Sequence, residues 1–199
     1  MVKELSIGVI GIQGAISEHI YSMQNALRIS KTPGKVFLIK NKEEINKIDG
    51  LILPGGESST ISKILYNSGI FDLIIKRIKK DDLPIMGTCA GCVLLSKELI
   101  DNTNDIKLLK AIDMQVKRNA FGRQRESFEK TIEISGFSKP YNAVFIRAPE
   151  IKKVWGKCKI LSKIDKKIIM ARQNNMLALS FHPELTEDFR IHKYFLDMF

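Results

Sequence analysis

The sequence predicts a three-layer α/β fold in which a mainly parallel central sheet is covered by helices on both faces. In the first half, short continuous apolar runs alternate with stretches whose apolar residues recur at helical spacing. Continuous apolar strands separated by helices are typical of parallel sheets buried on both faces. In the second half, short strand candidates are separated by turns that contain Gly, Pro, Asn or Asp, which indicates antiparallel strands added to one edge of the sheet.

The first half of the chain should supply four buried strands and four helices. The strands are expected at residues 5–10, 35–39, 50–53 and 83–87, and the helices at about 17–28, 58–67, 71–80 and 90–99. In the first helix, Ile16, Ile20, Met23 and Leu27 fall on one face. The second half should supply strands at 111–116, 128–134, 143–146, 158–164, 168–171 and 177–181, and a last helix at about 188–198. No linker or repeat divides the chain, so we expect one domain spanning 1–199.

The composition is typical of a soluble globular protein, with 199 residues of which 44% are apolar and 27% charged. The net charge is 32 − 22 = +10, but the lysines are scattered and not interleaved with aromatic residues, which indicates a solvated surface and no nucleic acid partner. No apolar stretch approaches the ~20 residues that span a bilayer, and the N-terminus does not resemble a signal peptide. We therefore expect no membrane association and a cytoplasmic location. Three cysteines argue against a disulfide framework.

The most informative segment for chemistry surrounds Cys89. An apolar strand leads into Gly87-Thr88-Cys89-Ala90-Gly91, and an apolar helix follows. This is the nucleophile-elbow pattern with cysteine in place of serine, in which the two glycines relieve crowding at a sharp turn. The turn should present the thiol at a helix N-terminus, which favours the thiolate. Two alternatives remain: a small buried residue, or a redox Cys-x-x-Cys pair formed with Cys92.

A candidate base follows the strand expected at 177–181. His182 lies at its end, and Glu184 is two residues further on. In extended backbone, residues i and i+2 face the same side, so Glu184 can hold one imidazole nitrogen while the other faces the thiol. Pro183 stiffens the link between them. A histidine at a strand end is more often structural, but its combination with a cysteine elbow favours catalysis.

Further groups could hold a substrate beside these residues. Gly55 and Gly56 end the third strand, and paired glycines let a backbone N–H approach a ligand closely, although an ordinary turn with Ser58 or Ser59 as helix N-cap explains them as well. Arg118 and Arg147 each lie where a probable strand meets a turn and can grip a carboxylate with two hydrogen bonds. Glu57 can meet an ammonium group.

Taken together, these segments resemble the class I (triad) glutamine amidotransferases, and among them the glutaminase subunits of pyridoxal 5′-phosphate synthase. The matching stretches extend over nearly the whole chain in the family's order. They are Gly8-Val9-Ile10-Gly11-Ile12-Gln13-Gly14, Leu51-Ile52-Leu53-Pro54-Gly55-Gly56-Glu57-Ser58, Gly87-Thr88-Cys89-Ala90-Gly91, Arg118-Asn119-Ala120-Phe121-Gly122-Arg123-Gln124, Phe145-Ile146-Arg147-Ala148-Pro149 and Ser180-Phe181-His182-Pro183-Glu184-Leu185-Thr186. The two arginine-containing stretches are the most specific to this subunit.

The resemblance implies a flavodoxin-like class I glutaminase fold and a role for each matching residue. Cys89, His182 and Glu184 would form the triad that hydrolyses L-glutamine to glutamate and ammonia, with the backbone N–H groups of Gly56 and Ala90 as the oxyanion hole. The residues implied to hold glutamine are Gly56, Glu57, Ser58, Arg118, Ile146 and Arg147. The ammonia would pass to a (β/α)₈-barrel synthase subunit within a large hetero-oligomer, and Gln13 would lie near that partner and help to organise the oxyanion site. No metal or cofactor is implied.

Three residues fall outside this pattern. Cys92 occupies a position where an aliphatic residue is expected, and it is either a buried packing residue or a thiol that can block Cys89 by oxidation. His19, near the start of the first helix, could support the partner interface. His192 is expected on the surface of the last helix. Rival functions are a glutaminase that serves another synthase, a thiol–disulfide oxidoreductase that uses Cys89 and Cys92, and a subunit without activity.

Overall fold

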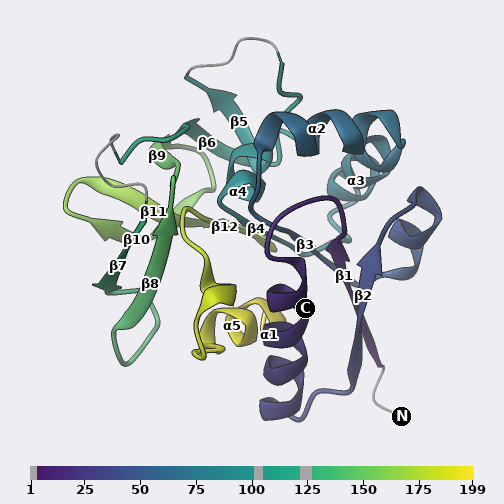
Figure 1. The fold of residues 1–199 in the computed structure, drawn as a ribbon, viewed down its shortest axis with the longest axis horizontal. Coiled ribbons are helices and arrows are strands. Elements are labelled where there is room, and N and C mark those ends of the chain that lie inside the picture. The colour runs from purple at the N-terminus through teal and green to yellow at the C-terminus, as the bar shows by residue number, and fades with distance from the viewer. Residues whose placement is uncertain (1–3, 101–104, 122–126) are drawn as a thin grey trace.

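The computed structural model describes residues 4–100, 105–121 and 127–199 (Figure 1). The Gly122, Arg123 and Gln124 positions of the matching stretch above lie outside the described residues. The helices are α1 (Ile16–Ile29), α2 (Ser58–Asn67), α3 (Ile70–Lys79), α4 (Ala90–Leu95) and α5 (Arg190–Leu196), with short 3-10 helices η1 (Lys42–Lys47) and η2 (Pro183–Leu185). The strands are β1 (Leu5–Ile10), β2 (Gly34–Ile39), β3 (Gly50–Leu53), β4 (Ile85–Thr88), β5 (Ser96–Leu99), β6 (Ile112–Lys117), β7 (Ser127–Ile132), β8 (Tyr141–Ile146), β9 (Glu150–Val154), β10 (Lys159–Ile164), β11 (Lys167–Gln173) and β12 (Met176–Leu179).

The central sheet has the strand order β2-β1-β3-β4-β12-β11-β9-β6-β5, with β10 paired to β11. Strands β2, β1, β3, β4 and β12 are mutually parallel, which is the flavodoxin-like order. Beyond β12, strands β11, β9 and β6 are each antiparallel to the preceding strand in this order, as the second half of the sequence predicts, and the edge strand β5 pairs parallel with β6. The last strand, β12, differs from that expectation because it pairs parallel with β4 in the middle of the sheet.

Helices cover both faces of the sheet, with α1 and α5 on one side and α2, α3 and α4 on the other (Figure 1). Successive residues of the parallel strands alternate between two buried clusters. In β3, Leu51 and Leu53 join the cluster beneath α2–α4, whereas Ile52 joins the cluster beneath α1 and α5. Because side chains alternate across a strand, a continuous apolar run is needed to fill both cores. The three-layer fold predicted from the sequence is confirmed.

The structure contains two strands, β5 and β9, that the sequence analysis does not predict. The helix expected at 90–99 ends at Leu95, because Ser96 adopts extended backbone and its Oγ donates to the Val93 carbonyl at 2.8 Å. Residues 96–99 then form β5, which pairs with β6. Strand β9 carries two adjacent lysines that obscure its alternation in the sequence. Strands β7 and β8 form a separate two-stranded sheet. None of the helices in the described ranges has the length and hydropathy of a transmembrane segment.

Candidate active site

The loops that carry the predicted site follow three neighbouring strands. Gly55 lies just after β3, Cys89 after β4, and His182 shortly after β12, and these strands are adjacent in the order β3-β4-β12. In a parallel sheet the carboxyl ends of neighbouring strands meet at one edge, which is where open α/β sheets bind ligands. The position of β12 beside β4, which the sequence does not predict, is therefore what brings His182 to Cys89.

Cys89 occupies a strained turn between β4 and α4. Its φ of 49° and ψ of −101° place a non-glycine residue in a sparsely populated region, at a typical cost of about 1–3 kcal/mol. Its backbone N–H donates to the Leu179 carbonyl at 2.8 Å, which fixes the turn against β12. The flanking glycines are necessary for close packing: a Cβ on Gly87 would lie 2.6 Å from the Gly91 carbonyl, and one on Gly91 would lie 2.1 Å from the Leu53 oxygen.

His182 and Glu184 form a close buried pair, with 2.7 Å between imidazole Nδ1 and carboxylate Oε1. The pairing does not use the extended geometry predicted from the sequence. Residues 183–185 instead form the 3-10 turn η2, which begins with Pro183 and bends Glu184 back toward the ring. The His182 backbone N–H donates to the Val144 carbonyl of β8 at 2.8 Å, so the base is anchored to the two-stranded sheet.

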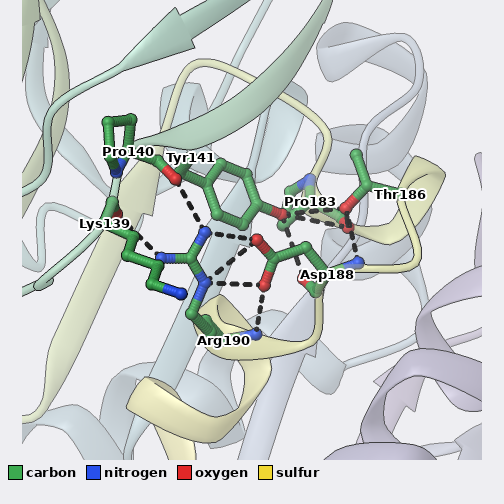
Figure 2. Close-up of polar contacts among 7 residues, drawn as sticks. All are labelled: Lys139, Pro140, Tyr141, Pro183, Thr186, Asp188 and Arg190. Carbon is green, nitrogen blue, oxygen red and sulfur yellow. Dashed lines mark hydrogen bonds and ion pairs between the residues drawn. The ribbon is translucent and has the colours of Figure 1, made fainter.

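The segment that carries Glu184 is held on its other side by Tyr141 and Arg190 (Figure 2). The Tyr141 hydroxyl lies 3.0 Å from Thr186 Oγ1, and the Arg190 guanidinium pairs with the Asp188 carboxylate. The same guanidinium donates at 2.8 Å to two carbonyl oxygens just before β8, those of Lys139 and Pro140. Polar networks of this kind restrict a segment to one arrangement. The η2 turn is therefore tied both to β8 and to the start of α5.

The electrostatic environment of His182 favours its charged form. Burial alone would lower the pKa of His182, but its hydrogen bonds with Cys89 and Glu184 outweigh burial and raise the pKa to about 10. Burial opposes ionisation of Glu184 too, yet the neighbouring His19 and His182 lower its pKa below the ordinary range. The site therefore holds an imidazolium between a thiol and a carboxylate, which is the environment that activates cysteine nucleophiles.

This raised pKa predicts how the stability of the protein varies with pH. Because the pKa of His182 is about 10 in the folded state and about 6.5 in an unfolded chain, its charge stabilises the fold fully below pH ~6.5, and this contribution is lost as the pH rises toward 10. We expect His182→Gln to lower the free energy of unfolding by about 3 kcal/mol at pH 6, with the difference from wild type narrowing toward pH 10. Urea unfolding of both proteins at several pH values measures this difference in the free energy of unfolding. A difference that widens as the pH rises would contradict the prediction.

A small pocket opens beside Cys89. It contains all the predicted substrate residues except Ile146, whose carbonyl oxygen instead accepts a hydrogen bond from the Cys89 thiol at 3.8 Å. Its lining residues are Gly56, Glu57, Ser58, Cys89, Ala90, Val93, Arg118, Asn119, Arg147 and Pro149. Val93, Asn119 and Pro149 are additions to the predicted site residues, although Asn119 and Pro149 belong to the two arginine-containing stretches.

Charged groups of both signs line this pocket. Arg118 Nη2 lies 2.8 Å from Glu57 Oε1, and Arg147 contributes from a turn in which its own φ is 41°. The Ala120 N–H donates to the Ala148 carbonyl at 3.0 Å, which joins the two arginine-bearing loops. A cation and an anion side by side complement a zwitterion such as a free amino acid.

The loop after β1 reaches the same site through Gln13. Its Oε1 accepts a hydrogen bond from the Glu57 N–H at 3.0 Å, and its side chain lies against Gly56, whose φ is 135°. Helix α2 has Glu57 as its N-cap with no side-chain capping bond, so the alternative of Ser58 or Ser59 as N-cap is wrong. Gln13 and Glu57 together fix the backbone of the glycine loop beside Cys89.

The structure buries both of the other histidines. His192 is fully buried, so the expectation that it lies on the surface of the last helix is wrong. His19 is fully buried too, and its expected support of the partner interface stays a prediction. The spacing of α1 contains the missing signal, because its buried residues His19, Met23 and Ala26 recur at helical intervals. Both histidines lie behind Glu184, with His19 Nε2 3.3 Å from Glu184 Oε2.

Cys92 is fully buried within the core beneath α2–α4. Burial raises the pKa of its thiol far above the ordinary range. Because the thiolate is the reactive form of cysteine, a buried and protonated thiol is a poor redox partner. The structure thus favours a packing role for Cys92 over the oxidoreductase alternative. In the described part of the chain, no group of three or more His, Cys, Asp or Glu side chains is arranged to hold a metal ion.

The fold and the site define a class of α/β proteins that present a thiol on a strand-to-helix elbow beside a histidine–carboxylate pair. The chain belongs to the SNO glutamine amidotransferase family, whose model matches residues 9–199. It is 47% identical to a protein of Pyrococcus furiosus named pyridoxal 5′-phosphate synthase subunit PdxT, over 98% of each chain. A protein of the same name from Methanococcoides burtonii is 48% identical over 97% of this chain and 98% of its own. The fold is similar to a crystal structure titled glutamine amidotransferase, with a TM-score of 0.87, 38% identity and coverage of 96% and 97% of the two chains.

Proposed function

We infer that this chain is the glutaminase subunit of a pyridoxal 5′-phosphate synthase and that it hydrolyses L-glutamine with Cys89, His182 and Glu184. The observation that carries this inference is the meeting of the Cys89 elbow and the His182–Glu184 pair beside a pocket that contains Arg118 and Arg147. Membership in a glutamine amidotransferase family and the names of its relatives support glutamine as the substrate and vitamin B6 biosynthesis as the pathway.

Hydrolysis proceeds in two halves. The Cys89 thiolate attacks the carboxamide carbon of glutamine, and the resulting oxyanion is held by the N–H groups of Gly56 and Ala90. The first residue of a helix has no intrahelical acceptor for its N–H, which leaves that of Ala90 available. The His182 imidazolium then protonates the leaving nitrogen, and the departure of ammonia leaves a thioester between Cys89 and the glutamyl group. His182 next takes a proton from water, whose oxygen attacks the thioester to release glutamate and the thiol. Glu184 orients the ring throughout.

The pocket residues recognise the amino-acid end of glutamine. Arg118 and Arg147 bind the α-carboxylate, and Glu57, which already lies against Arg118, binds the α-ammonium group. Gly56, Ser58 and the carbonyl of Ile146 complete the site near the carboxamide. Because these contacts form with the ground state and the transition state alike, they act mainly on substrate affinity.

Arg118→Lys tests this assignment. We expect KM for glutamine to rise about 10- to 100-fold, because a lysine cannot form two parallel hydrogen bonds to a carboxylate, while kcat changes little. Steady-state kinetics of ammonia release measure both constants. Arg28→Lys on the exposed part of α1 is the matched control and should leave both unchanged. A fall in kcat with KM unchanged would place Arg118 in the chemistry and contradict this role.

The ammonia passes to a synthase subunit of (β/α)₈-barrel fold within a large hetero-oligomer in the cytoplasm. Gln13 lies at the partner-facing side of the site, where its contacts with Glu57 and Gly56 join the interface to the oxyanion loop. Docking of the partner would then organise the catalytic geometry through Gln13.

The experiment that tests the function is ammonia release from glutamine with and without the synthase subunit. We expect the partner to stimulate hydrolysis and Cys89→Ala to abolish it in both conditions. Hydrolysis without stimulation would leave the amidase standing and refute the synthase assignment. No ammonia release in either condition would refute both. A pull-down with the barrel subunit separates this protein from a glutaminase that serves another synthase.

A further inference from the structure

The chain contains three histidines, and all three meet in one buried cluster around Glu184. His19 lies on α1, His182 follows β12, and His192 lies on α5. His19 and His192 are fully buried and His182 is 7% exposed. Buried polar side chains are expensive unless they are paired. The mechanism above uses only His182, so the other two need an explanation.

The contacts in this cluster connect Glu184, His19, His192 and the residue before the nucleophile. Glu184 Oε1 faces His182, whereas its Oε2 lies 3.3 Å from His19 Nε2, a close polar contact outside hydrogen-bond geometry that leaves this buried oxygen without a hydrogen-bond partner among the described residues. The same nitrogen of His19 is 3.1 Å from the Thr88 hydroxyl, on the residue before Cys89. On the other side of the ring, His19 Nδ1 lies 3.3 Å from His192 Nε2. His19 therefore links the orienting carboxylate to the elbow.

The tautomers of both rings follow from these contacts. Among the described residues, His192 Nδ1 has no hydrogen-bond partner. A buried N–H without an acceptor is rarer than an unsatisfied acceptor, so the proton of His192 belongs on Nε2 and is donated to His19 Nδ1. His19 then carries its own proton on Nε2 and donates it to the Thr88 hydroxyl, with Glu184 Oε2 close beside the same nitrogen. The opposite tautomer would aim a lone pair at the carboxylate.

We propose that His19 is a positioning residue of the hydrolytic site, which holds Glu184 from the side opposite His182, and that His192 fixes its tautomer. The clamp spans three elements, because it joins α1 and α5 to the end of β4. It leaves Glu184 with one oxygen for His182 and restrains the other, so that the imidazole keeps its direction toward Cys89. This inference rests on the role of Glu184 proposed above.

The charges that face His19 come from its own helix and from the segment after β12. Burial is the largest effect and lowers the pKa of His19. Glu184 and Glu18 oppose it by favouring the charged ring, whereas His182 disfavours that form. Burial and the adjacent His19 lower the pKa of His192 to about 3, against a weak opposing effect of Glu184. Both rings are therefore neutral at neutral pH, as a clamp of defined tautomers requires.

Long-range ¹H–¹⁵N spectra of the full chain, labelled at histidine, test the clamp in the wild-type protein. Only three imidazoles contribute, and His192→Phe assigns one of them. We expect His19 and His192 each to be protonated at Nε2 alone from pH 7 to 9. A proton on His19 Nδ1, or titration of either ring in that range, would overturn the proposal.

A pair of variants tests the positioning role. In His19→Gln the amide nitrogen can take the place of Nε2 and still donate to Thr88 beside Glu184, whereas in His19→Asn it takes the place of Nδ1 and cannot. Loss of the donor that bonds Thr88 and lies against the buried Glu184 oxygen predicts that Cys89 alkylation by iodoacetamide at pH 7 slows about 10-fold in His19→Asn and is largely restored in His19→Gln. Peptide mass spectrometry reports Cys89 alone, and thermal unfolding checks that both variants fold.

Equal rates in both variants and the wild type, or equal losses in both variants, would overturn the proposal. Alkylation needs no glutamine, so this result is independent of the proposed function. With glutamine, kcat should fall in His19→Asn while KM is unchanged. A chain that shows the alkylation pattern without ammonia release would refute the glutaminase assignment and leave the clamp standing.

Discussion

Cys89→Ala is expected to abolish glutamine hydrolysis, lowering kcat by on the order of 10⁴-fold or more. Alanine keeps the backbone of the elbow but removes the atom that forms the thioester, and none of the remaining pocket residues offers a thiol in its place. Substrate binding should survive, because the arginines and Glu57 are unchanged. Ammonia release by the complex with the synthase subunit measures the loss, and calorimetric titration with glutamine measures the retained binding.

Cys92→Ala is the matched control for this variant. It removes a thiol that lies three residues further on, within α4, but from a fully buried position. We expect activity close to wild type, with a stability loss of about 1 kcal/mol for the deleted sulfur. Full activity in Cys89→Ala, or loss of activity only in Cys92→Ala, would refute the proposed nucleophile.

Gly91→Ala should destabilise the fold by about 3 kcal/mol or more. Inside a helix, alanine is normally favoured over glycine by about 1 kcal/mol. Here its Cβ would lie 2.1 Å from the Leu53 carbonyl oxygen and 2.9 Å from the Leu53 Cβ. Leu53 is paired with Gly87 across the β3–β4 ladder, so its carbonyl cannot withdraw without breaking the sheet at the site. Urea unfolding followed by circular dichroism measures the loss.

Gly136→Ala separates steric overlap from backbone strain. Gly136 has a φ of 89°, but a Cβ at this position would meet no heavy atom within 4 Å, so only the left-handed backbone penalty of about 1–2 kcal/mol applies. We expect Gly91→Ala to be clearly the more damaging of the two. A Gly91→Ala protein as stable as wild type would contradict the prediction that Gly91 is needed for close packing of β3 against the elbow.

Much of the fold and of the candidate site is readable from short segments of the chain. The apolar runs of β1, β3 and β4 and the helical spacing of α1 and α2 are local patterns, and the structure confirms the layers that they predict. The family is readable in the same way, because its motifs are contiguous stretches of sequence, and the match to the family model confirms it. The roles of Cys89, His182 and Glu184 stay predictions, which the variants above test.

Features that depend on distant parts of the chain were not readable in this way. By contrast, the tight turn at Cys89 is readable from its flanking glycines and apolar residues, because the geometry of the elbow is a local property. The insertion of β12 beside β4, the η2 turn that bends Glu184 toward His182, and the burial of His19 against His192 all arise from segments that meet only when the sheet closes. Their positions depend on long-range packing, which short sequence patterns do not encode.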